Sequence, residues 1–216
     1  MLDEYTTILN RAEAEFVEKK SRFIATVCPV KTEEEARAFI AEMRKKYWDA
    51  THNVFAYQIG ERNEIQRSSD DGEPQGTAGK PALDVLIGGD IKNTAVVVTR
   101  YFGGTLLGTG GLVRAYGRSA KLGIEAAGIA NVKHYKECSV ETDYTTAGKI
   151  QYEITKEEYI LKDTIYTDKV EFIVLLDREN EKPFEDMVKN ITMGKSQVNV
   201  IREIYGAWVN GAVAEL

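Results

Sequence analysis

The sequence has few of the residues that most often carry catalysis, metal binding or cross-links. Its 216 residues include two cysteines and two histidines. Cys28 and Cys138 form no CxxC pair, which disfavours a disulfide framework and a thiolate metal site. No GxSxG, HExxH or metal-spaced Cys/His set is present either. The sequence therefore favours binding over catalysis, and we expect no cofactor.

The sequence also lacks long apolar runs and an excess of positive charge. No stretch approaches the ~20 apolar residues that a membrane-spanning helix needs. The beginning of the chain is acidic and has neither the basic nor the apolar region of a signal peptide. A net charge of −6 argues against a general basic coat for nucleic acid, but leaves room for a local basic patch. We expect a cytoplasmic protein that does not associate with membranes.

Glycine and charge divide the chain into two predicted domains, residues 1–131 and 132–216. Of the 18 glycines, 13 lie between Gly72 and Gly128, where a helix is predicted to stop. Residues 1–132 have a net charge of −1 and residues 133–216 one of −5, so the acidity belongs mostly to the second part.

Hydrophobic patterns predict an α+β fold for both domains. In the first, β-rich runs are predicted near residues 22–30, 53–59 and 95–101, and helices begin at Thr32 and at Gly110. Residues 82–87 are predicted to form a short helix or a buried turn. In the second, strands are expected at 134–143, 159–166, 170–176 and 197–208. Helices are expected at 145–156, capped by Thr145 or Thr146, and at 183–191, with Pro183 in the first turn. That order, βαββαβ, is the one of ferredoxin-like domains.

Two glycine-rich loops, residues 70–81 and 100–117, are the predicted functional surface. The first combines Asp70, Asp71 and Glu73 with three glycines and two prolines, and its carboxylates could hold a hard cation, although the calcium-loop spacing is absent. The second follows a strand and opens a helix, a succession that offers free backbone N–H groups to a phosphate or carboxylate. It matches neither the Walker A nor the dinucleotide fingerprint. The candidate binding residues of this second loop are Gly103, Gly104, Thr105, Gly108, Gly110 and Gly111.

The helix after the second loop carries a basic stripe. Arg114, Arg118 and Lys121 share one side by their spacing, and either a solvated helix face or an anionic partner explains them. We expect Arg100 to join them in contacting phosphate, and Tyr101 or Tyr116 to stack on bases, although aromatic residues at these spacings fit a core equally well.

His52 is the one candidate for proton transfer in the first domain. It stands beside Asn53 at the start of a predicted strand. A structural or surface role explains a lone histidine more simply than catalysis does.

Four stretches together resemble the IMPACT/YigZ family: KKSRFIATVCPV, the segment around Ala50–Asn53, DDGEPQGTAGKP and TRYFGGTLLGTGGLVRAYG. The resemblance implies a first domain like domain IV of elongation factor G, an α/β sandwich shared with a ribosomal protein, and a second domain like its domain V. Eukaryotic members of the family regulate translation initiation through an additional N-terminal domain. The fifteen residues before Phe16 are too few for that domain, so only the general link to translation is implied, and not the eukaryotic partner.

Three hypotheses follow. The leading one is a non-catalytic regulator of translation that binds RNA, the ribosome or a translation-associated protein. The second is an enzyme or sensor that binds a phosphorylated small molecule or nucleotide at Gly108–Gly111, with the acids of the first loop holding Mg²⁺ and His52 assisting proton transfer. The third is an adaptor that docks through its acidic C-terminal domain.

Overall fold

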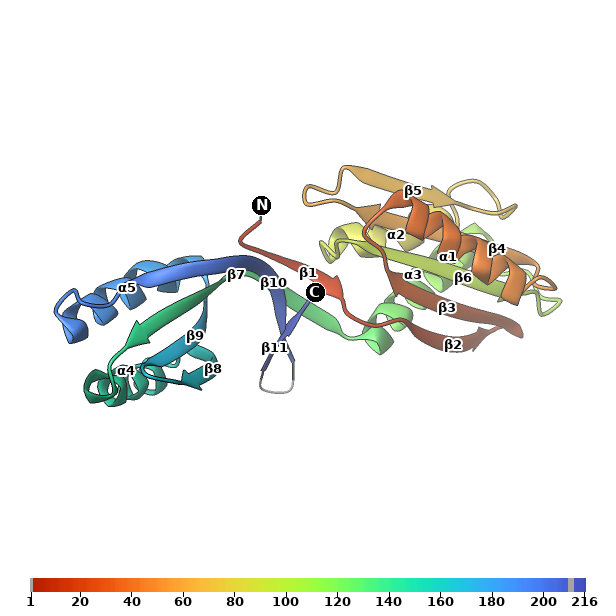
Figure 1. Ribbon diagram of the computed structural model, residues 1–216. Coiled ribbons are helices and arrows are strands. Elements are labelled where there is room, and N and C mark those ends of the chain that lie inside the picture. The colour runs from red at the N-terminus through yellow and green to blue at the C-terminus, as the bar shows by residue number, and fades with distance from the viewer. Residues whose placement is uncertain (1, 210–211) are drawn as a thin grey trace. The chain divides into compact units, whose positions relative to one another are not determined.

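The protein divides into two compact units (Figure 1). The structure is a computed structural model that describes residues 2–209 and 212–216. One unit is Tyr5–Asn131. The other contains the described part of Val132–Leu216 together with residues 2–4, so the first residues of the chain belong with the C-terminal unit, unlike in the division expected from the sequence.

The first unit is built on an antiparallel sheet whose strand order is β2-β3-β6-β4-β5. Central strand β6 lies between β3 and β4, which pair with it along most of its length. The bounds are β2 (Ala12–Glu18), β3 (Ser21–Pro29), β4 (His52–Ile59), β5 (Ile65–Ser69) and β6 (Thr94–Tyr101).

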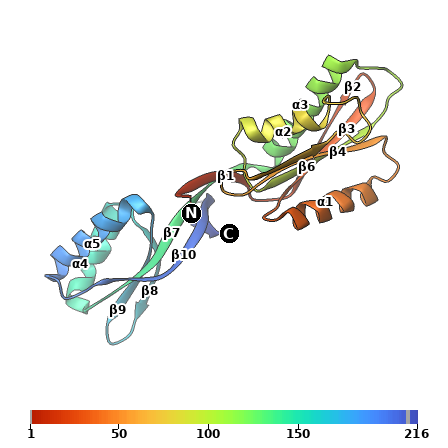
Figure 2. The same ribbon diagram turned by 90° about the horizontal axis from the view of Figure 1, so that it is seen from above.

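Helices cover both faces of this sheet (Figure 2). Helix α1 (Glu33–Lys46) lies on one face, and α2 (Gly79–Gly88) and α3 (Thr109–Ala127) lie on the other. In β6, Val96 and Val98 belong to the core under α2 and α3, whereas Ala95 and Val97 belong to the core under α1. Burial on both faces explains why residues 95–98 of β6 are consecutively apolar rather than alternating with polar residues.

Local signals set the helix ends of this unit. The Thr32 side chain accepts a hydrogen bond from the Glu35 amide and caps α1, as the sequence predicted. Helix α3 ends at Gly128, whose φ of +77° lies in the left-handed region that glycine adopts without strain.

The second unit has the ferredoxin-like arrangement that the sequence predicted. Its elements follow the order βαββαβ, and its antiparallel sheet has the order β10-β7-β9-β8 with β11 added beyond β10. The bounds are β7 (Ile129–Thr142), α4 (Tyr144–Lys156), β8 (Ile160–Tyr166), β9 (Val170–Leu176), α5 (Arg178–Thr192), β10 (Val198–Val209) and β11 (Ala212–Glu215). Strand β1 (Glu4–Ile8) belongs, apart from Glu4, to the first unit.

Two helix starts in this unit differ from expectation. Asp143, rather than Thr145 or Thr146, caps α4 by accepting a hydrogen bond from the Thr146 amide. Helix α5 begins after Asp177, so Pro183 lies inside the helix instead of in its first turn. In both cases an aspartate just before the helix supplies the cap, which is the stronger start signal.

Four strands, β1, β2, β5 and β11, were not expected from the sequence. They are short or carry polar residues on the exposed face, and β2 alternates acidic and apolar residues. Among the described residues, no helix combines the length and the apolar character that a membrane span requires.

The Gly79→Ala variant tests the packing of the first loop. A Cβ on Gly79 would lie 2.7 Å from the backbone of Ser69, so we expect unfolding to require about 1–3 kcal/mol less free energy. Gly88→Ala changes the same residue type in the same helix, but its Cβ would meet no atom within 4 Å. We expect that control to keep or slightly raise stability in urea unfolding. Equal losses of stability in both variants would contradict the close approach of Gly79 to the Ser69 backbone.

Candidate functional site

The two glycine-rich loops meet at a buried hydrogen-bonded network. Arg100, near the end of β6, donates from Nη1 to Oε1 of Glu73 in the first loop, at 2.5 Å. The Tyr116 hydroxyl of α3 donates to the same oxygen at 2.7 Å. Arg100 is 4% exposed and Tyr116 is fully buried. The network therefore connects the first loop to the beginning and the end of the second loop, at Arg100 and Tyr116.

The environment of this network fixes its protonation and geometry. Burial, and then the neighbouring Glu73 carboxylate, raise the pKa of Tyr116 far above its usual range, so the hydroxyl keeps its proton. The Arg100 guanidinium lies between the rings of Phe23 and Phe102, with both centroids 5.4 Å away. Arg100 also donates from Nη2 to Ser21, whose hydroxyl oxygen accepts from the Gly103 amide as well.

The other two acids of the first loop have structural partners. Asp70 accepts hydrogen bonds from the amides of Gly76, Ala78 and Gly79, at the start of α2. Asp71 accepts from the Asn53 amide and from Arg44. Among the residues that the structure describes, no group of three or more Asp, Glu, His or Cys side chains could hold a metal ion.

The glycines of the second loop serve close packing and unusual backbone angles. Gly103 lies against the Lys20 carbonyl group, where a Cβ would come within 2.0 Å of backbone. Gly104 and Gly108 have φ values of +81° and +74°. Thr105, Gly110 and Gly111 complete the exposed or half-exposed loop and the first turn of α3.

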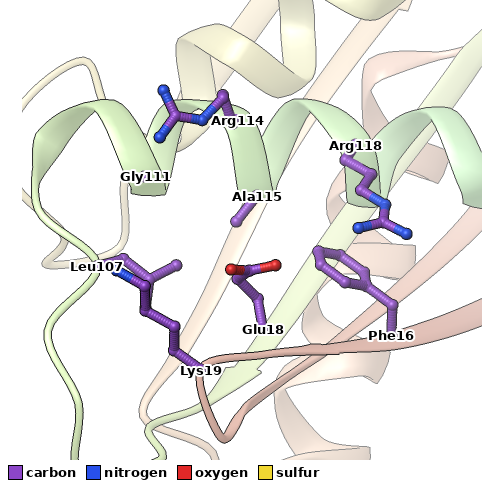
Figure 3. A pocket seen from close by; sticks show the side chains of 8 residues that line it. All are labelled: Phe16, Glu18, Lys19, Leu107, Gly111, Arg114, Ala115 and Arg118. Atoms are coloured by element: carbon purple, nitrogen blue, oxygen red, sulfur yellow. The ribbon is translucent and has the colours of Figure 1, made fainter.

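A basic face lies along α3 and the β2–β3 turn; we define it as Lys19, Arg114, Arg118 and Lys121. All four side chains belong to exposed residues. Figure 3 shows Lys19, Arg114 and Arg118 around a pocket of about 240 Å³ that also contains Glu18. The Arg118 guanidinium stacks on the Phe16 ring at 4.7 Å.

Two predicted contact residues are not on this face. Arg100 and Tyr116 are buried and bonded to Glu73, so the expectation that they contact phosphate and stack on bases is wrong for this structure. Tyr101 is half-buried and donates its hydroxyl hydrogen to Asp49. Lys19 was not predicted from the sequence as a binding residue, because only the tertiary fold brings the β2–β3 turn beside α3.

His52 lies beside the network. Its Nε2 is 3.8 Å from Oε1 of Glu73, and its Nδ1 is 2.8 Å from the Asp71 carbonyl oxygen. The structure thus brings His52 and Glu73, which are separate in the sequence, to one place next to the second loop.

Fold and sequence comparisons agree on the class of protein: two α+β units, of which the second is ferredoxin-like. The Impact N-terminal domain family matches residues 19–124, and a domain of unknown function (DUF1949) matches residues 140–195. The chain belongs to the IMPACT family.

Its similarity to bacterial relatives extends over both units. The chain is 43% identical to the IMPACT family member YvyE of Bacillus subtilis, over 92% of this chain and 91% of that protein. It is 48% identical to the IMPACT family member YigZ of Escherichia coli, over 46% of this chain and 50% of the relative. A crystal structure of a hypothetical protein covers 94% of this chain and 99% of its own, with 29% identity and a TM-score of 0.59.

The buried ion pair gives a first prediction for this site. Glu73→Ala leaves the Arg100 charge without its carboxylate, and we expect a loss of about 3–5 kcal/mol in the free energy of unfolding. The double variant Glu73→Ala/Arg100→Met also removes that charge and should recover part of the loss. The free energies of unfolding of both variants in urea measure the interaction between Glu73 and Arg100. A double variant that is less stable than Glu73→Ala would contradict an uncompensated buried charge as the cause.

Asp70 gives a second prediction, on pH. Burial raises the pKa of Asp70, but the hydrogen bonds from Gly76, Gly79 and Ala78 outweigh it and hold the pKa below its ordinary value of 3.8. A lowered folded-state pKa means stability that is fully present above that ordinary value and is lost as the pH falls through the folded pKa. Asp70→Ala should therefore cost about 1–2 kcal/mol at pH 7, and the gap from wild type should shrink below pH ~3.5. A gap that does not depend on pH would contradict this role of the charge.

Proposed function

We propose that the chain is a cytoplasmic regulator of translation that binds RNA of the ribosome through its basic face. The observation that carries the proposal is the set of free cations on that face. Within the described residues, Lys19, Arg114 and Arg118 have no ion-pair partner, and Lys121 has only a 3.8 Å contact with Glu125. Membership of the IMPACT family, whose eukaryotic members regulate translation initiation, supports the proposal.

Many cations elsewhere on the first unit are paired, although Lys20, Lys31, Lys45, Arg62 and Arg67 have no ion pair within the described residues. Arg11, Arg22, Arg37, Arg44, Lys46 and Lys80 each lie within 3.1 Å of a carboxylate oxygen. An exposed ion pair presents little net charge to a polyanion, whereas unpaired Lys and Arg side chains can contact phosphates and release their counterions. The protein as a whole has a net charge of −6, so a local cluster of cations such as the basic face is the surface that fits a nucleic acid.

Ribosome co-sedimentation tests this proposal. We expect the wild type to pellet with ribosomes at ~50 mM salt and much less at ~200 mM, because phosphate contacts weaken steeply with salt. Arg114→Glu/Arg118→Glu should pellet poorly at both concentrations. Loss of two phosphate contacts should also lower the slope of log affinity against log salt by about 2.

The control reverses two exposed lysines on helices of the other unit, Lys149→Glu/Lys189→Glu, with the same change in net charge. We expect it to pellet more than the arginine variant. Equal pelleting of wild type and the arginine variant would contradict ribosome binding through the basic face. An absence of pelleting for all three proteins would contradict ribosome binding itself. Pelleting that survives nuclease treatment would indicate binding to an acidic protein and would contradict binding to RNA.

A further inference from the structure

A second concave site lies beside the buried network, and none of the four side chains of the basic face lines it. It is a cleft of about 440 Å³ between the two glycine-rich loops. His52, Glu73 and Arg100 contribute its charged or titratable groups, and Pro74, Phe102 and Leu106 its apolar ones. Phe102 and Leu106 are 46% and 83% exposed, which is unusual for large apolar side chains. The cleft thus offers both polar groups and an apolar surface, as small-molecule sites do.

One pole of the cleft accepts hydrogen bonds. The Asp71 carbonyl oxygen can only accept, so Nδ1 of His52 carries the hydrogen in their 2.8 Å contact. In the neutral ring, Nε2 is then an acceptor. It has no hydrogen-bond partner among the residues that the structure describes, and lies 3.8 Å from Oε1 of Glu73.

Glu73 adds a second acceptor to this pole. Arg100 and Tyr116 both donate to Oε1, whereas Oε2 accepts no hydrogen bond from the described part of the chain. The Glu73 side chain is only 4% exposed. Because Oε2 is not among the fully buried atoms without a partner, it is accessible from the cleft and can accept a hydrogen bond from a ligand.

The opposite pole is the first turn of α3. Its N-cap, Gly108, has no side chain, and within the described residues the amides of Thr109, Gly110 and Gly111 donate to no protein acceptor. Gly108 and Thr109 line the cleft. Free amides and the positive end of a 19-residue helix favour an anionic group. Arg100 compensates the charge of Glu73, so that carboxylate does not exclude an anion nearby.

We infer that this cleft binds a small organic acid that carries a hydrogen-bond donor and an apolar group. The acid group lies at the amides of Thr109–Gly111, and a hydroxyl or ammonium group donates to Nε2 of His52 or Oε2 of Glu73. The apolar group covers Phe102 and Leu106. This inference uses none of the four side chains of the basic face, although Gly111 and Leu107 also line the pocket of that face.

Amide NMR titration with 3-phenyllactate tests the inference, since this probe has a carboxylate, a hydroxyl and a phenyl group. We expect it to shift the amide signals of Thr109, Gly110 and Gly111 and the ring signals of His52. Two matched compounds each lack one pole: 3-phenylpropionate has no hydroxyl, and 2-phenylethanol has no carboxylate. Each should bind about tenfold more weakly. Equal binding of all three, or shifts outside the cleft only, would overturn the inference.

A pair of variants isolates the anion pole. Thr109→Pro removes one amide hydrogen at the first position of α3, where proline is tolerated, and Thr109→Ala removes only the hydroxyl. We expect Thr109→Pro to weaken 3-phenyllactate binding about tenfold and Thr109→Ala to weaken it less. Unchanged amide signals from β6 and α2 verify that both variants fold. Undiminished binding to folded Thr109→Pro, or no shift in the wild type at 10 mM probe (roughly the range expected of such a small ligand), would overturn the inference.

Discussion

The buried ion pair between Arg100 and Glu73 is the interaction on which the site depends. A charge pair that is about 95% shielded on both side chains is costly to desolvate, and it persists only with further hydrogen bonds. Tyr116 and Ser21 supply these bonds from two other elements. Because the partners come from the first loop, β6, α3 and β3, the pair fixes all of these segments to one another. The pair itself lines the cleft, and the helix that carries most of the basic face, α3, supplies Tyr116 to it.

The glycines have a different role from the one that their number suggested. A glycine-rich loop before a helix is typical of phosphate cradles, but Gly79 and Gly103 are required because other backbone segments lie against them. Asp70 likewise takes up amides at the start of α2, a place where an anionic ligand could otherwise bind. Among the described residues, the first turn of α3 differs in that no side chain caps it.

Most of the fold could be predicted from the sequence, and much less of the site. The β-branched run of β6, the Thr32 cap and the βαββαβ order are local signals, and the structure confirms them. The burial of Arg100 is not local: its partner Glu73 lies 27 positions away, and an arginine at a strand end is usually exposed. Tyr116 had a signal that favoured the core, since it lies four residues from both Leu112 and Ala120 on the apolar side of α3.

Hydrogen–deuterium exchange of Tyr116→Phe tests the central claim, that one network joins both loops. The variant removes a single donor to Glu73 and keeps the ring in its core position. If the network joins the loops, amides at Ala78 and Gly79 and at Gly103 should exchange faster together, by similar factors, although none of these residues contacts the Tyr116 hydroxyl. Faster exchange that is confined to α3 would contradict the claim.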